Sequence, residues 1–178
     1  MERGADVKAT AADGVTALHL AFNPEGAPAE VAPLLLEGGA DASAATSDGT
    51  TPLHLAMSVG SDADALVRAL VEHGADVEAL DGSGRSPLVV AAMAGCVEAV
   101  RALLANGVDA RAVQRDGWTA LHIAALNGHV DLVRLLLEHG ADRDARNEEG
   151  HTAADLARLA GKVEVLPVLG AQGQGQGQ

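Results

Sequence analysis

The residues most able to do chemistry in this sequence are its seven histidines, which first suggest a zinc site. His19, His54 and His122 each end a Thr-x-Leu-His tetrad, and these tetrads belong to separate helical units. Equivalent positions on packed helices lie at least about 8–10 Å apart, whereas zinc needs ligand atoms that converge at about 2 Å. His73 and His139 stand where helices are expected to end, a position that suits a partial positive charge. No metal site is therefore expected.

Three other segments suggest catalytic or ligand-binding chemistry and fail on inspection. Asp142–Asn147 begins like a calcium loop, but Arg146 occupies a ligand position and the glycine of the sharp turn is missing. Gly82–Arg85 resembles a phosphate cradle without the full glycine pattern or a Walker-type lysine. Cys96 lies at a predicted helix start, which would favour a thiolate, yet no histidine in register completes a Cys-His pair. The sequence predicts no catalytic residue and no cofactor.

The elements that position these residues are clearest in the stretch from Gln114 to Arg146. Thr119 can accept a hydrogen bond from a first-turn amide, so we expect a helix to begin there. Asn127-Gly128-His129 interrupts this helix, and Leu132, Val133, Leu136 and Leu137 then mark one face of a second helix. Gly140 ends the second helix, because glycine enters the left-handed cap without a Cβ penalty.

The same phrase recurs along the chain. Thr16, Thr51, Ser86, Thr119 and Thr152 follow one another at intervals of 35, 35, 33 and 33 residues, and Gly-Ala-Asp or a variant begins at Gly4, Gly39, Gly74, Gly107 and Gly140. With tetrads such as Thr51-Pro52-Leu53-His54, the pattern resembles the ankyrin repeat, whose signature is T-P-L-H-x-A followed by a second helix and G-A-D. The resemblance implies an all-α solenoid of about five helix-turn-helix units joined by β-hairpin-like finger loops. It also implies that the tetrad histidine is structural and bonds within and between repeats.

The repeat register divides the chain into successive units. We expect a partial N-terminal repeat or hairpin, four repeats, a C-terminal capping repeat and a flexible Gly/Gln tail, at residues 1–12, 13–47, 48–82, 83–115, 116–148, 149–169 and 170–178. The N-terminal hairpin has two interpretations: an array cut from a longer one, which we favour, or a bare edge.

Composition restricts the class of partner. The net charge of −13 argues against nucleic acid, whose phosphates need a basic surface. The longest uncharged runs are shorter than the ~20 residues that span a bilayer, so no membrane insertion is expected. One cysteine and no signal-peptide pattern favour a cytoplasmic or nuclear setting. We expect a monomer that binds a protein or peptide.

The resemblance also indicates a binding surface. In ankyrin arrays the finger loops and the inner face of the first helix form a concave groove, and the residue before the tetrad points into it. An apolar spot with basic neighbours is thus predicted between repeats three and four, and its residues are Arg85, Met93, Arg115, Trp118, Leu126 and Asn127. Tryptophan and arginine are enriched in interface hot spots, although Trp118 could equally pack on the neighbouring finger.

The sequence leaves two functions open. One is a protein–protein interaction module, and the other is a regulatory or targeting segment of a larger enzyme or channel whose chemistry lies outside this chain.

Overall fold

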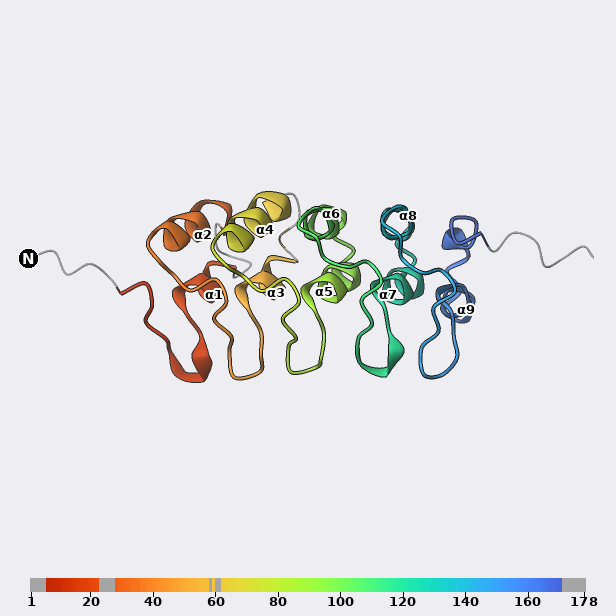
Figure 1. Cartoon of the computed structure of the whole chain (residues 1–178), viewed down its shortest axis with the longest axis horizontal. Helices are drawn as coiled ribbons and strands as arrows, with labels where there is room; N and C mark the ends of the chain where they lie inside the picture. Colours follow the sequence, from red (N-terminus) through yellow and green to blue (C-terminus); the bar gives the residue numbers. More distant parts are fainter. Residues whose placement is uncertain (1–5, 23–27, 58, 60–61, 171–178) are drawn as a thin grey trace, which may run out of the picture.

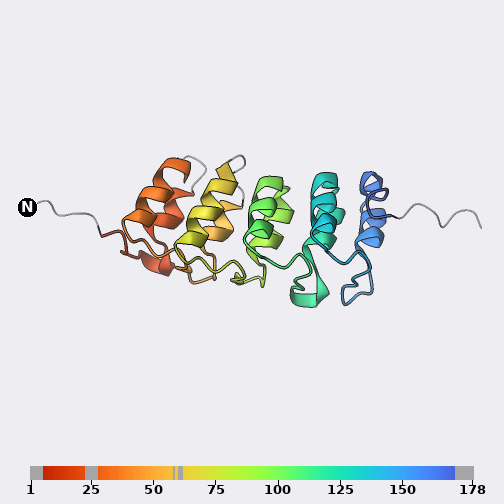
Figure 2. The ribbon, with the colours of Figure 1, turned by 45° about the horizontal axis from the view of Figure 1, so that its top comes forward.

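The computed structural model describes residues 6–22, 28–57, 59 and 62–170, and within this part the chain forms a linear array of helix pairs (Figure 1). The first helix of each pair lies in one row, the second helices lie in a second row, and the loops between pairs project as fingers on one side. Figure 2 shows the pairs standing side by side along the array. The predicted all-α solenoid is confirmed: the described residues contain no strand, only isolated bridges at Thr10–Thr16 and Val113–Thr119.

The helices recur in the order that the tetrads predict. The first helices are α1 (Ala17–Ala21), α3 (Pro52–Ala56), α5 (Pro87–Ala94), α7 (Ala120–Asn127) and α9 (Ala153–Leu159). The second helices are α2 (Pro28–Glu37), α4 (Ala63–Glu72), α6 (Val97–Ala105) and α8 (Val130–Glu138). Short 3-10 turns occur at η1 (Ala12–Gly14), η3 (Arg115–Gly117) and η4 (Val163–Val165).

Each first helix begins where a Thr or Ser side chain caps it. Thr119 Oγ accepts a hydrogen bond from the His122 amide, and the His122 ring in return accepts one from the Thr119 amide. This reciprocal arrangement satisfies two amides that otherwise lack carbonyl partners. Gly128 then ends α7 in the left-handed region with φ of 78°, as the sequence predicts.

The fingers stack closely enough to exclude side chains at certain positions. Gly117 has φ of 76°, and a Cβ atom there would lie 2.9 Å from Cα of Asn147 in the next finger. Neighbouring fingers are also joined by backbone hydrogen bonds, such as that from the Glu148 amide to the Asp116 carbonyl at 3.0 Å. Glycine in the finger therefore fixes the spacing of the array.

The core is built from Ala, Leu and Val that each repeat buries against the next. Leu135 in α8 is 3% exposed because α6 covers it. The equivalent Leu34 in α2, also five residues before its terminal glycine, is 68% exposed, since α2 is the first of the second helices among the described residues and no other second helix packs on that side. At the other end, α9 is followed by η4 instead of a full second helix, and Val165 and Leu169 are buried there.

Several expectations concern residues outside the described ranges. The tail expected to be flexible lies outside the described residues, except for Gly170. Residues 1–5 of the partial N-terminal repeat and most of the loops between the helices of repeats one and two also lie outside them.

Candidate functional site

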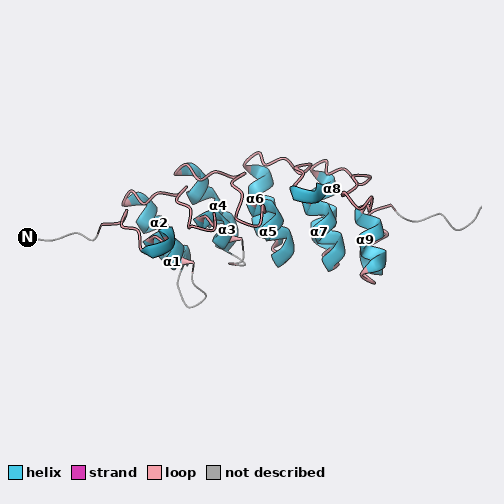
Figure 3. Cartoon of the chain, turned by 90° about the horizontal axis from the view of Figure 1, so that it is seen from below, coloured by secondary structure: helices cyan, strands magenta, loops and turns pink. Residues whose placement is uncertain are grey.

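The six predicted contact residues lie on two neighbouring repeats and fall into two groups. Arg85, Arg115 and Trp118 belong to the fingers, whereas Met93, Leu126 and Asn127 lie at the far ends of α5 and α7. Trp118 and Leu126 are eight residues apart across α7, which corresponds to about 12 Å along the helix axis. These six residues, which lie on both sides of the junction of repeats three and four, are called the strip below. Figure 3 shows α5 and α7 adjacent at this junction.

Trp118 is half-buried, and its ring packs against His122 of its own repeat. The ring centroids are 5.9 Å apart with planes at 65°, an edge-to-face arrangement that aromatic pairs favour. Packing and partner contact thus need not exclude each other for this side chain, because one side of the indole is held while part of it stays exposed.

Arg85 is already engaged by a carboxylate. Its Nε and Nη2 atoms lie 2.8 Å and 2.7 Å from Oδ2 of Asp81. Burial would raise the pKa of Asp81, but hydrogen bonds from Arg85 and Ser83 together with the guanidinium charge outweigh it and hold that pKa below its usual value. Arg85 is therefore a neutralised finger residue with a partly exposed side chain.

Arg115 differs from Arg85, because no carboxylate within the described residues forms an ion pair with it. Its side chain is exposed and reaches across to the preceding finger, where a Cβ atom on Gly84 would lie 3.4 Å from its Nε atom. Of the two arginines in the predicted site, Arg115 is the one whose charge no carboxylate of the described residues neutralises.

The far end of the strip is apolar. Met93 is 45% exposed, Leu126 is half-buried and Asn127 is exposed. The equivalent residue in repeat five, Leu159, is 71% exposed. Large apolar side chains thus continue from repeat three to repeat five at this end of the first helices.

The tetrad histidines join consecutive repeats. In each, Nδ1 accepts the capping threonine amide, so the proton lies on Nε2 and is donated to a carbonyl of the next repeat. His19 donates to Thr50 at 3.1 Å, His54 to Arg85 at 3.0 Å and His122 to His151 at 3.2 Å. His122 Nε2 also lies 3.1 Å from the carbonyl of Ala145, at the end of its own repeat. The predicted structural role within and between repeats is confirmed.

His122 is 1% exposed, and its burial lowers its pKa from the usual 6.5, although hydrogen bonds to the carbonyls of Ala145 and His151 act in the opposite direction. The neutral ring is the form that both accepts at Nδ1 and donates at Nε2. His122 in this form bonds at both ring nitrogens and so joins its own helix start to the next repeat.

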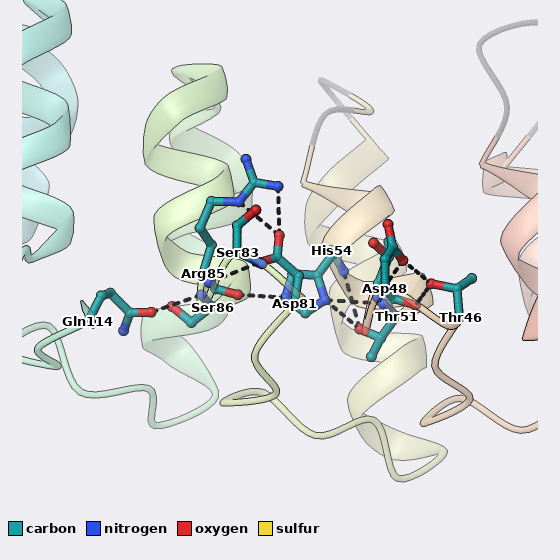
Figure 4. A network of polar contacts seen from close by, with 10 residues as sticks. Thr46, Asp48, Thr51, His54, Asp81, Ser83, Arg85, Ser86 and Gln114 are labelled. Atoms are coloured by element: carbon teal, nitrogen blue, oxygen red, sulfur yellow. Dashed lines mark hydrogen bonds and ion pairs between the residues drawn. The ribbon is translucent and has the colours of Figure 1, made fainter. Parts of the chain in front are cut away.

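Repeat three departs from this scheme, and sequence reasoning missed how. Val89 replaces the histidine, so the Ser86 amide has no acceptor on its own helix. Oε1 of Gln114, from the finger that leads into α7, accepts that amide at 3.0 Å (Figure 4). The only signal in the sequence is the valine in the tetrad, which shows that a partner is missing without showing what supplies it.

Other features lie apart from the strip. Arg111 and the segment from Gly140 to Asp144 line an open depression of about 500 Å³ between the loop that follows α6 and the loop that follows α8. Nowhere in the described part of the chain do three or more His, Cys, Asp or Glu residues gather as they would around a metal ion. Within the same residues, no helix has the length and apolarity that crossing a membrane requires.

Comparison with known proteins gives a family match over most of the chain. A model described as "Ankyrin repeats (3 copies)" matches residues 1–81, and one described as "Ankyrin repeats (many copies)" matches residues 88–137 and 127–169. No curated protein matches the chain.

Proposed function

This chain belongs to the ankyrin-repeat family, whose members are generally protein-interaction modules and typically non-catalytic; on this premise we propose that it binds a partner protein non-covalently in the concave groove between its fingers and first helices. The contact surface is the strip across repeats three and four that holds Trp118, Met93, Leu126, Asn127, Arg115 and Arg85.

The observation that carries this proposal is a partly exposed tryptophan beside an arginine that pairs with no carboxylate among the described residues, at the junction that also holds the exposed Met93. Trp118, the one tryptophan of the chain, is half-buried, and Met93 is 45% exposed. Interface hot spots are enriched in tryptophan that a partner can desolvate completely. A partner that covered Trp118 would find it already oriented by His122, which lowers the entropy cost of fixing the ring.

Charge indicates how the partner is oriented. An acidic group of the partner pairs with Arg115, because Asp81 already neutralises Arg85. Apolar side chains of the partner lie against Met93 and Leu126 at the far end. The partner segment therefore runs along the first helices and carries its acidic group at the finger end.

The test is to compare partners captured by the wild type and by Trp118→Ala, and then to measure the affinity of each identified partner by calorimetry. We expect Trp118→Ala to cost ~2 kcal/mol or more of binding, about 30-fold in affinity. A matched control is Val15→Ala, since Val15 is half-buried at the same position in repeat one; it should bind as the wild type does. If Trp118→Ala binds normally but melts much earlier, the indole is a packing residue and the proposed site is wrong.

A further inference from the structure

At the start of every first helix, the backbone amide of the N-cap Thr or Ser needs a hydrogen-bond acceptor. His19, His54 and His122 supply a ring nitrogen to Thr16, Thr51 and Thr119, at 3.2, 3.2 and 3.1 Å. In repeat five, Oδ2 of Asp155 does so for Thr152 at 3.1 Å. In these four repeats the acceptor comes from the same helix.

In repeat three the acceptor comes from outside the first helix α5. Ser86 is 6% exposed, and its amide meets Oε1 of Gln114, which is 28 residues further along the chain. Because the Ser86 amide donates, the acceptor must be the carboxamide oxygen. The backbone amide of Gln114 at the same time donates to the Trp118 carbonyl at 2.7 Å. One residue thus connects the N-cap of α5 to the finger that carries Trp118.

The junction of repeats three and four also lacks two connections that the other junctions have. A histidine donates across each of the others, whereas Val89 has no donor. Fingertip backbone bonds join Ser47 to Asp13, Gly82 to Asp48 and Glu148 to Asp116, and the described residues contain no such bond from Arg115 to Ser83. At this junction the Gln114 side chain therefore supplies a polar connection, its hydrogen bond to the Ser86 amide, where the other junctions have the histidine and fingertip bonds.

We propose that Gln114 is the positioning residue of the partner-binding strip, an inference that rests on the proposed function above. Arg85 and Met93 lie on the repeat-three side of the junction, and Trp118 and Leu126 on the repeat-four side. A partner that contacts both sides requires their mutual placement to be fixed before binding, and preorganisation of this kind lowers the entropy cost of association. The Gln114 carboxamide fixes it by tying the Trp118 finger to Ser86.

The experiment compares Gln114→Leu with Gln114→Glu in the full chain. Leucine keeps the size of the side chain but offers no acceptor, whereas glutamate keeps the acceptor oxygen. The first readout is hydrogen exchange of the Ser86 amide by NMR. The second is acrylamide quenching of Trp118 fluorescence, which is specific because the chain has one tryptophan. Neither readout needs a partner.

We expect Gln114→Leu to speed exchange of the Ser86 amide by roughly tenfold or more, as loss of the partner of a buried amide implies, and to increase quenching of Trp118. Gln114→Glu should retain wild-type values for both. Thr46→Val is the matched control, since Thr46 holds the same finger position at the junction where His19 serves the Thr16 amide. It should leave exchange of the Thr16 amide unchanged.

The proposal is overturned if Gln114→Leu leaves Ser86 exchange and Trp118 quenching as in the wild type, or if Gln114→Glu is as disruptive as Gln114→Leu. It is also overturned if Thr46→Val exposes the Thr16 amide to the same degree, because the effect would then belong to any finger. Failure of the binding site itself is recognised separately, by normal partner affinity of Trp118→Ala beside an intact Gln114 effect on exchange.

Discussion

Leu34 and Leu135 occupy the same position in different repeats, which makes Leu34→Ala and Leu135→Ala a test of how the array buries its core. Leu135 is 3% exposed beneath the preceding helix pair, whereas Leu34 is 68% exposed at the start of the array. Both leucines begin a Leu-Leu-Leu-Glu run and stand five residues before the terminal glycine, although Pro33 precedes Leu34 where Arg134 precedes Leu135. The difference between the two variants therefore isolates the covering repeat.

The expected magnitudes differ by several-fold. Truncating a fully buried leucine costs about 2–5 kcal/mol, because lost transfer free energy adds to the cavity left behind. Leu34 has only about a third of its surface buried, so its truncation should cost about 0.5–1 kcal/mol with no enclosed cavity. Leu135→Ala should thus lower the free energy of unfolding by at least about 1 kcal/mol more than Leu34→Ala does.

Equilibrium unfolding in guanidinium chloride, followed by far-ultraviolet circular dichroism, measures both free energies. Hydrogen exchange of individual repeats should accompany it, since a linear array need not unfold as one unit. Equal destabilisation by the two substitutions would refute the reasoning, because Leu34 would then be covered in solution. Sedimentation at several concentrations would show whether a second copy covers it.

Two further predictions concern charge. The pKa of His122 is lowered in the folded state, so the stability it contributes is complete above its unfolded pKa of about 6.5 and is lost as pH falls through the folded value. Thermal unfolding from about pH 8 to 5 should show this loss, with a weaker dependence in His122→Gln; an identical profile would contradict it. Arg115→Glu should mainly slow association with the partner and reverse its salt dependence, because rim charges steer encounter more than they hold the complex. Stopped-flow kinetics at low and high salt measures this, and a change confined to dissociation would exclude a steering role.

The helix positions could be predicted from sequence because their causes are local. Thr119 and His122 cap α7 through contacts within one turn, and Gly128 and Gly140 act through their own backbone conformation. Repetition of the same local solution then fixed the register of the whole array. The tetrad histidines were correctly assigned for the same reason.

The state of the candidate site was less predictable, because its contacts depend on the shape of the fingers. The sequence indicates Arg85 as a basic neighbour of the apolar spot, and it gives no sign that the finger folds back so that Asp81 reaches the Arg85 guanidinium. Spacing of four residues implies proximity on a helix, and these residues are not on one. The edge-to-face contact of Trp118 with His122 likewise crosses the helix start.

Within an array of this kind, an irregular residue in one repeat has to be compensated by its neighbour. Val89 removes an acceptor that four other repeats supply from their own first helix, and the buried Ser86 amide would cost roughly 1–3 kcal/mol if left without a partner. Gln114 provides the acceptor from the finger that leads into α7. A bond from Gln114 thus stands in place of the histidine bond and connects the N-cap of α5 to the finger of the half-buried Trp118. The first helix without a tetrad histidine and the finger that carries the indole therefore depend on one side chain.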